Sequence, residues 1–115
     1  MKLKLLIVED NAEVRRMIRR VVSSIAGEIN EVDDGKKAFA AYAGFLPDWV
    51  LMDIEMKQLS GITAAAEIKV AFPEANIVMV TNYNNANLRE KAAQAGACGY
   101  VLKENLTDLL ELLTT

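Results

Sequence analysis

The sequence predicts an α/β fold in which a five-stranded parallel sheet is covered by helices on both faces. Short apolar runs of strand length alternate five times with stretches of helical periodicity. Three of the runs are apolar at every position, as strands buried on both faces are. Repeated strand–helix units favour a parallel sheet. We expect one domain over residues 1–115, since no linker or low-complexity segment interrupts the pattern.

The five predicted strands differ in how apolar they are. They are residues 5–8, 28–32, 49–52, 77–80 and 98–102. The first, third and fourth are continuously apolar, which suits the centre of the sheet, whereas the polar second run suits an edge. A doubly wound sheet with strand order 2-1-3-4-5 satisfies both conditions. Such sheets bind ligands outside the carboxyl ends of their strands.

Five helices are predicted between and after these strands. The first has the clearest pattern, because its apolar residues recur at intervals of three and four from Val14 to Ile25 and arginines occupy its other face. The other four are indicated by shorter apolar sets, which are Ala38/Phe39/Tyr42/Phe45, Ala65/Ile68/Phe72, Leu88/Ala92/Ala95 and Leu106/Leu109/Leu110/Leu113. Pro47 and Pro73 each follow a helix, and Gly96 stands where a C-terminal cap is expected.

The composition excludes several kinds of chemistry. The 115 residues include no histidine, so there is no Ser-His or Cys-His nucleophile pair and no imidazole ligand, and a metal must be held by oxygen. The one cysteine, Cys98, cannot form an internal disulfide and is expected to be a small buried residue. Four methionines, at positions 17, 52, 56 and 79, are expected to fill the core.

Net charge and hydropathy restrict the partners and the location. The formal charge is −3, which gives the chain no electrostatic reason to coat DNA or an anionic membrane. The sequence shows neither a signal peptide nor a run of about 20 apolar residues that could span a membrane. We therefore expect a cytoplasmic protein with no membrane partner.

Polar residues gather at the carboxyl edge of the predicted sheet. Glu9 and Asp10 follow the first strand, Asp53 the third, Thr81 the fourth and Lys103 the fifth. Three facing carboxylates raise one another's pKa unless a cation is supplied, and one lysine cannot neutralise all three. Mg²⁺ held by one or two carboxylates is usual in phosphoryl-transfer sites. The residues therefore predict chemistry on phosphate, with one carboxylate as the nucleophile.

A family resemblance rests on Glu9-Asp10, residues 47–56, Gly61, Thr81 and residues 96–103. Together they make essentially the whole chain resemble the receiver domain of two-component response regulators, which has a flavodoxin-like fold similar to that of chemotaxis regulators. The resemblance implies that the chain accepts a phosphoryl group from a histidine kinase, a phosphotransfer protein or a small acyl phosphate. It also implies a signalling domain that catalyses its own phosphorylation and dephosphorylation rather than a metabolic enzyme.

The resemblance implies a role for each residue of the site. Asp53 would be the phospho-acceptor, and Lys103 would pair with the phosphoryl oxygens. Mg²⁺ would be bound by Asp10 and Asp53, by Glu9 mainly through water, and by the backbone carbonyl of Glu55.

The resemblance also implies a switch and an output surface. Thr81 and Tyr100 would form the switch, with the hydroxyl moving toward the phosphoryl group and the ring turning inward into the space vacated. The helix after the fourth strand has a thin apolar stripe, and low local stability suits a switching segment. In this family the face formed by the fourth helix, fifth strand and fifth helix often mediates dimerisation, so a homodimer is one expectation. A DNA-binding output domain beyond the C-terminal end of this chain is another.

Some positions depart from the family pattern. Glu104 stands where proline commonly follows the lysine, and because a cis bond costs about 2.5–4 kcal/mol without proline, the Lys103-Glu104 peptide is predicted to be trans. Asn82 places an amide beside the phosphorylation pocket, where the family usually has Ala or Gly. Glu55 and Tyr83 occupy positions at which the family tunes phosphoryl lifetime by admitting or blocking water.

Two alternatives come from other functional classes. One is a receiver-like interaction module that works by binding alone, and Asn82 is the main reason to keep it. The other is a Mg²⁺-dependent aspartyl phosphatase of the haloacid-dehalogenase type. That family has Asp-x-Asp-x-Thr, whereas this chain reads Asp-Ile-Glu-Met-Lys from Asp53, and 115 residues leave no room for the usual cap. A nucleotide-binding sheet is disfavoured because neither G-x-G-x-x-G nor G-x-x-x-x-G-K occurs.

Overall fold

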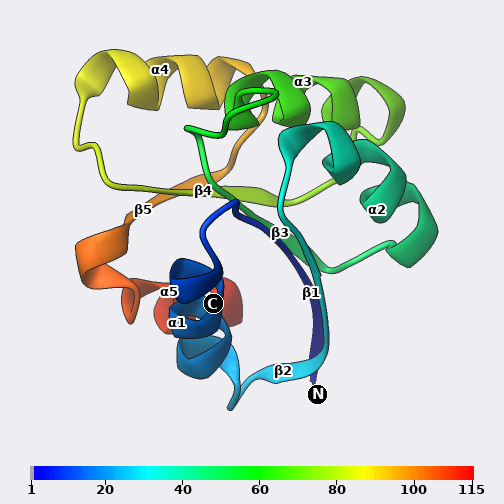
Figure 1. Ribbon diagram of the computed structural model, residues 1–115. Helices are drawn as coiled ribbons and strands as arrows, with labels where there is room; N and C mark the ends of the chain where they lie inside the picture. The colour runs from blue at the N-terminus through cyan, green and yellow to red at the C-terminus, as the bar shows by residue number, and fades with distance from the viewer. Residues whose placement is uncertain (1) are drawn as a thin grey trace.

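The computed structural model describes residues 2–115 and contains a five-stranded parallel sheet (Figure 1). Its strands are β1 (Leu3–Val8), β2 (Ala26–Val32), β3 (Trp49–Met52), β4 (Ile77–Thr81) and β5 (Gly99–Leu102). The order β2-β1-β3-β4-β5 and the parallel pairing confirm the prediction, with the polar β2 at one edge. The first two strands begin two residues earlier than predicted, and β5 begins one residue later.

Five α-helices within residues 2–115 cover the two faces of the sheet. They are α1 (Ala12–Val22), α2 (Ala38–Phe45), α3 (Gly61–Ala71), α4 (Ala86–Gln94) and α5 (Asp108–Thr114). Figure 1 shows α1 and α5 on one side of the sheet and the other three helices on the opposite side. This is the doubly wound arrangement that the sequence predicts.

The sheet separates two hydrophobic clusters. Successive strand residues point to opposite faces, so each central strand contributes to both clusters. The α3-side cluster lies under α2, α3 and α4, and its strand residues are Leu6, Val8, Val50, Met52, Ile77 and Met79. The α1-side cluster lies under α1 and α5, and its strand residues are Leu5, Ile7, Leu51, Val78, Val80 and Val101. Burial on both faces explains why β1, β3 and β4 are apolar throughout.

Helix α1 is shorter than its apolar stripe. It ends at Val22, and the carbonyl of that residue accepts the Ile25 N–H at 3.0 Å as the chain turns toward β2. The Ile25 carbonyl then accepts the Leu3 N–H at 2.9 Å, so this residue already pairs beside β1. The Ile25 side chain therefore packs against the α1-side cluster from the turn rather than from the helix.

Two side chains are more exposed than predicted. Met17 is 46% exposed, because α1 directs Ile18 and Val22 at the sheet and leaves Met17 at the margin of that face. Cys98 is also exposed, because it precedes β5 in the turn that follows α4. The predictions of burial were therefore wrong for these two residues. Of the other methionines, Met52 and Met79 are fully buried and Met56 packs against the α3-side cluster.

Side-chain caps fix the starts of three helices near the carboxyl edge of the sheet. Asn11 Oδ1 accepts the Val14 N–H at the start of α1, and Asn85 Oδ1 accepts the Leu88 N–H at the start of α4, both at 3.1 Å. Ser60 caps α3 in the same way. Caps satisfy backbone donors that the first helical turn leaves free. They therefore fix the positions at which the chain leaves the sheet.

Two further predictions concern the backbone and the membrane. Every peptide bond within residues 2–115 is trans, including Lys103-Glu104. Gly96 has a φ of 106° and ends the turn after α4, as its predicted role as a C-terminal cap requires. Across residues 2–115, none of the helices has both the length and the apolar character needed to cross a bilayer.

Candidate functional site

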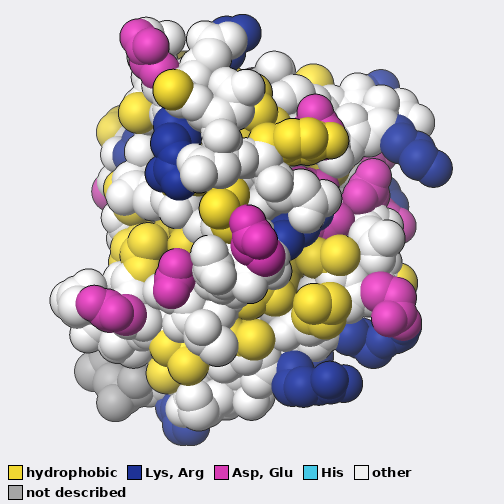
Figure 2. Space-filling view, turned by 90° about the vertical axis from the view of Figure 1, so that its left-hand side faces the viewer, with side chains coloured by type: hydrophobic (Ala, Val, Ile, Leu, Met, Phe, Trp, Pro, Cys, Tyr) yellow, Lys and Arg dark blue, Asp and Glu magenta, His cyan; other side chains and the backbone are white. Residues whose placement is uncertain are grey.

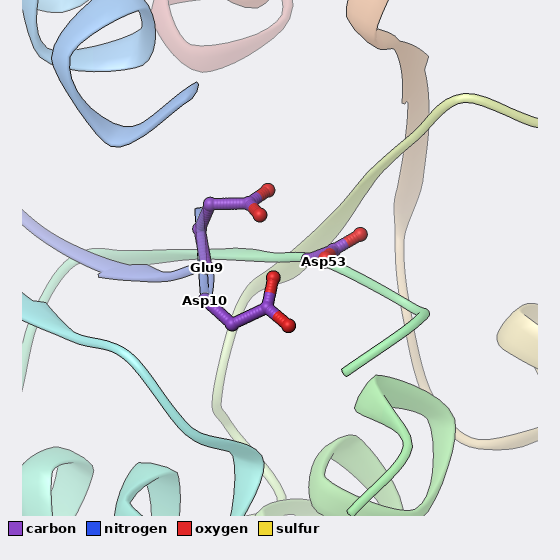
Figure 3. A group of neighbouring side chains, drawn as sticks. All are labelled: Glu9, Asp10 and Asp53. Atoms are coloured by element: carbon purple, nitrogen blue, oxygen red, sulfur yellow. The ribbon is translucent and has the colours of Figure 1, made fainter. Parts of the chain in front are cut away.

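Glu9, Asp10 and Asp53 meet at the carboxyl edge of the sheet, where β1 and β3 end. One carboxylate oxygen from each residue lies within 4.8 Å of the others. Figure 3 shows the three carboxylates around one common space. Glu9 is 1% exposed and Asp53 is 4% exposed, whereas Asp10 is half-buried. The site is thus a largely buried acidic cluster that opens on the side of Asp10.

Backbone contacts hold this cluster in place. The Asp53 N–H donates to the Val8 carbonyl at 2.9 Å, and the Glu9 N–H donates to the Val32 carbonyl at 3.1 Å, so the sheet ladder continues beyond the strands. Gly61 begins α3 directly against β3, and a Cβ added there would overlap the Asp53 carbonyl oxygen. Glycine at position 61 is therefore required for α3 to pack beside Asp53.

Lys103 supplies the positive charge of the cluster. It follows β5, and its Nζ lies 2.9 Å from Glu9 Oε1 and 3.3 Å from Asp53 Oδ1. One ammonium faces three carboxylates, so the charges within this cluster do not balance. A buried surplus of negative charge is costly unless a cation compensates it.

The ionisation equilibria reflect this surplus. Burial raises the pKa of Glu9 to about 7, and the Asp53 carboxylate adds to the shift while Lys103 opposes it. Burial also raises the pKa of Asp53, again against the effect of Lys103. Burial alone would lower the pKa of Lys103, but the Glu9 and Asp53 carboxylates outweigh it and raise that pKa. The raised pKa values of Glu9 and Asp53 mean that burial disfavours their charged forms, and the raised pKa of Lys103 means that the carboxylates favour its charged form. Added positive charge would therefore stabilise the site.

The donor set fits a hard divalent cation. Glu9 Oε2 accepts the Asn11 N–H at 3.1 Å, but within residues 2–115 no donor meets the buried Glu9 Oε1 with hydrogen-bond geometry, and its contact with Lys103 is an ion pair. Carboxylate oxygens are the ligands that Mg²⁺ prefers. Glu9, Asp10 and Asp53 are the side chains available to hold such an ion.

Thr81 and Tyr100 lie on the two strands next to the cluster. Thr81 ends β4, is fully buried, and its hydroxyl accepts the Tyr83 N–H at 3.3 Å. Tyr100 lies in β5 opposite Met79, and its half-buried side chain packs against the α3-side cluster. The loop after β4 links these two residues, because the Tyr100 hydroxyl donates to the Tyr83 carbonyl at 2.5 Å.

A surface groove begins beside the acidic cluster. Its volume is about 640 Å³, and it runs between the start of α3 and α4. Asp10 and the exposed Glu55 line one part of it, and Lys57 and Lys91 line another. The groove gives a small molecule access to the open side of the cluster.

Sequence reasoning missed Arg89. Its guanidinium lies 4.3 Å from the centre of the Tyr100 ring, although the two residues belong to a helix and a strand eleven positions apart. The helical pattern of α4 is weak, and no spacing rule pairs a helix residue with a residue of the following strand. Only the packed fold brings them together.

Comparisons with known proteins agree with this fold. Residues 5–114 match the response regulator receiver domain family. The chain is 36% identical over 101 residues to the chemotaxis protein CheY of Bacillus subtilis (strain 168), which covers 87% of this chain and 84% of that protein. It is 34% identical over 100 residues to the chemotaxis protein CheY of Halobacterium salinarum, covering 87% and 83%.

Longer relatives and solved structures also match. The uncharacterized transcriptional regulatory protein YxjL of Bacillus subtilis is 32% identical over 114 residues, which are 95% of this chain and only 51% of that protein. A two-component response regulator of the LuxR family from Aurantimonas sp. SI85-9A1 has a TM-score of 0.89 at 27% identity, covering 98% of this chain and 85% of that one. A DNA-binding response regulator of the LuxR family from Staphylococcus aureus has a TM-score of 0.87 at 28% identity, covering 96% and 95%.

Proposed function

This chain belongs to the response regulator receiver domain family, and we propose on that basis that Asp53 is its phospho-acceptor, in a receiver domain formed by residues 1–115. The phosphoryl group would come from the histidine of a kinase or phosphotransfer protein, or from a small acyl phosphate. The observation that carries the proposal is the convergence of Asp53 with Glu9, Asp10 and Lys103 at one buried edge. Having no histidine, the chain depends on a partner for any phosphohistidine.

The transfer needs few chemical steps. A carboxylate oxygen of Asp53 attacks the phosphorus atom, and the P–N bond of phosphohistidine or the P–O bond of the acyl phosphate breaks as the leaving atom keeps the electron pair. Lys103 pairs with a phosphoryl oxygen. In dephosphorylation, water attacks the phosphorus, the bond to Asp53 breaks and inorganic phosphate leaves. Positioning and charge stabilisation dominate such reactions.

Mg²⁺ belongs to this proposal. Asp10, Asp53 and the backbone carbonyl of Glu55 would bind it directly, and Glu9 would act mainly through water. When bound, the ion neutralises charge on the phosphoryl oxygens. Support comes from the negative surplus of the cluster and from the raised pKa of Glu9 and of Asp53.

The switch would involve the two residues beside the cluster. A phosphoryl group on Asp53 adds nearly two negative charges and three acceptor oxygens, so the Thr81 hydroxyl would move toward it and Tyr100 would fill the space vacated. Helix α4 follows Thr81 and contains one buried residue, Ala92. A helix so lightly anchored is suited to change position.

The family works with histidine kinases, and we propose one as the partner of this chain. We also propose a homodimer through α4, β5 and α5. Figure 2 shows that side of the molecule, where hydrophobic side chains reach the surface in several separate groups between charged ones. Because YxjL is about twice as long as the matched region and is described as a transcriptional regulator, a C-terminal DNA-binding output domain is a further proposal. The proposed location is the cytoplasm, where a lone thiol stays reduced.

The deciding experiment is intact mass spectrometry after incubation with Mg²⁺ and acetyl phosphate. A single phosphoryl adduct is expected on the wild type and on Asp108→Asn, an exposed control in α5, and none on Asp53→Asn. If no adduct forms and beryllofluoride with Mg²⁺ also fails to bind, the interaction module replaces this proposal. Turnover of many phosphate esters per protein would instead indicate the aspartyl phosphatase.

A further inference from the structure

Two contacts hold the side chain of Tyr100. Its hydroxyl donates a hydrogen bond to the Tyr83 carbonyl oxygen, 2.5 Å away. The guanidinium of Arg89 lies 4.3 Å from the centre of its ring. A cation over an aromatic face is attracted by the ring quadrupole. Together these contacts keep the ring against the α3-side cluster.

Arg89 is itself fixed on its other side. Its Nε donates to Asn84 Oδ1 at 3.2 Å, and Asn84 lies in the loop after β4. Arg89 therefore contacts the loop after β4 through Asn84 and β5 through Tyr100, while belonging to α4. Ala92 is the one buried residue of α4, and Arg89 adds a contact at the surface between this helix and β5.

We propose that Arg89 is a positioning residue for the switch, and that it holds the Tyr100 ring inward against the loop after β4 before any phosphoryl group is present. This inference rests on the proposed function, because it concerns the arrangement that a phosphoryl group on Asp53 stabilises. Arg89 raises the fraction of unmodified chains already in that arrangement. The apparent affinity for a phosphoryl group increases with this fraction.

Three variants of Arg89 separate its charge from its packing. Arg89→Met removes the cation and the bond to Asn84 but keeps a long apolar side chain, and Arg89→Gln is a second uncharged form. Arg89→Lys keeps a cation that can lie over the ring. Arg20→Met is the matched control, because it removes the same charge from an exposed position of α1, on the other face of the sheet. Equal thermal unfolding midpoints would establish that the variants are comparably folded.

The first measurement reports on the ring itself. The chain has three tyrosines, so 3-fluorotyrosine labelling gives three ¹⁹F resonances, which single Tyr→Phe variants assign. We expect the Tyr100 resonance to move in Arg89→Met and to stay in place in Arg20→Met. The Tyr42 resonance, from a buried position in α2, should not move in either variant.

The second measurement reports on coupling to the phosphoryl site. Titration with beryllofluoride and Mg²⁺ should show apparent affinity reduced about two- to fivefold in Arg89→Met, the range expected for an exposed cation–π contact. Affinity for Mg²⁺ alone should be unchanged, and Arg89→Lys should retain most of the beryllofluoride affinity.

The outcomes distinguish this inference from the proposed function. If the wild type fails to bind beryllofluoride, the proposed function is wrong. If the wild type binds it and Arg89→Met binds equally well or more tightly, the function stands and the role of Arg89 is overturned. A loss in Arg89→Lys as large as in Arg89→Met would show that the cation over the ring is not the cause.

Discussion

Lys103 lies nearer to Glu9 than to Asp53, with Nζ 2.9 Å from Glu9 Oε1 and 3.3 Å from Asp53 Oδ1. The ammonium thus compensates most directly the carboxylate that is most buried, and the proposed phospho-acceptor keeps a less neutralised oxygen. An uncompensated carboxylate oxygen is the better nucleophile. The same imbalance makes the metal-free site a source of instability, from which two predictions arise.

The first prediction concerns pH. Because the folded-state pKa of Glu9 is raised from 4.5 to about 7, the folded state holds this proton more tightly than the unfolded state. The resulting stability is fully present below pH 4.5 and is lost as pH rises through about 7. The raised pKa of Asp53 acts in the same direction.

Urea unfolding without metal should therefore give a free energy that falls by on the order of 2 kcal/mol between pH 5 and pH 8. Glu9→Gln should flatten this dependence, and Glu28→Gln, on the exposed edge of β2, should leave it unchanged. Saturating Mg²⁺ should also reduce it. An identical slope in Glu9→Gln would show that Glu9 is not the titrating group.

The second prediction is that Asp53→Asn stabilises the metal-free protein while removing phosphorylation. The amide has nearly the shape of the carboxylate but no charge, so it relieves repulsion with Glu9 and Asp10 and leaves Lys103 paired with Glu9. We expect a gain of about 1 kcal/mol in unfolding free energy at pH 8. The gain should shrink when Mg²⁺ is added to both proteins, and a loss of stability at pH 8 would contradict the charge argument.

The third prediction concerns the close approach of α3 to Asp53. Gly61→Ala forces a Cβ into the Asp53 carbonyl oxygen, so α3 or the end of β3 must shift. We expect a cost of roughly 2–4 kcal/mol in unfolding free energy and weaker Mg²⁺ binding.

Gly44→Ala is the matched control for Gly61→Ala. Gly44 lies in α2, and a Cβ added there meets nothing within 4 Å. Since alanine is the better helix former, this variant should be stabilised by up to about 1 kcal/mol. Equal effects of the two substitutions would refute the steric explanation.

The fourth prediction concerns the start of α4. Asn85→Ala removes the side-chain oxygen that accepts the Leu88 N–H at 3.1 Å, and the loss of such a cap costs about 1 kcal/mol. Amide hydrogen exchange should accelerate in α4 and stay unchanged in α1. Asn87→Ala, two positions further along the same helix, should not accelerate it. Faster exchange throughout the chain would show that the cap supports the whole fold rather than α4.

The strand order was predictable because the polarity of each strand indicates whether it is buried on both faces or lies at an edge. A polar run at 28–32 and continuous apolar runs at 5–8, 49–52 and 77–80 suit an arrangement with the second strand at an edge. The position of the acidic cluster was predictable for a related reason. Parallel strands end at one edge, so Glu9 and Asp53 had to meet there once β1 and β3 were neighbours.

What the sequence did not predict depends on tertiary contacts. The exposure of Met17 is decided by which way α1 faces, since the next residue, Ile18, is buried, and the exposure of Cys98 is decided by where β5 begins. The contact of Arg89 with Tyr100 joins α4 to β5, and no local sequence pattern predicts how these two elements pack against each other. The raised pKa of Glu9 likewise arises from burial that only the assembled sheet creates.

Helix α4 contributes Ala92 alone to the buried core. Most of its positions are therefore free to change in evolution without loss of the fold, since substitutions at exposed sites usually alter stability by less than about 0.5 kcal/mol. The surface of this helix can then change while the acidic cluster and the strands beneath it keep their arrangement. A single anchoring residue thus lets the same acidic cluster be combined with many different helix surfaces.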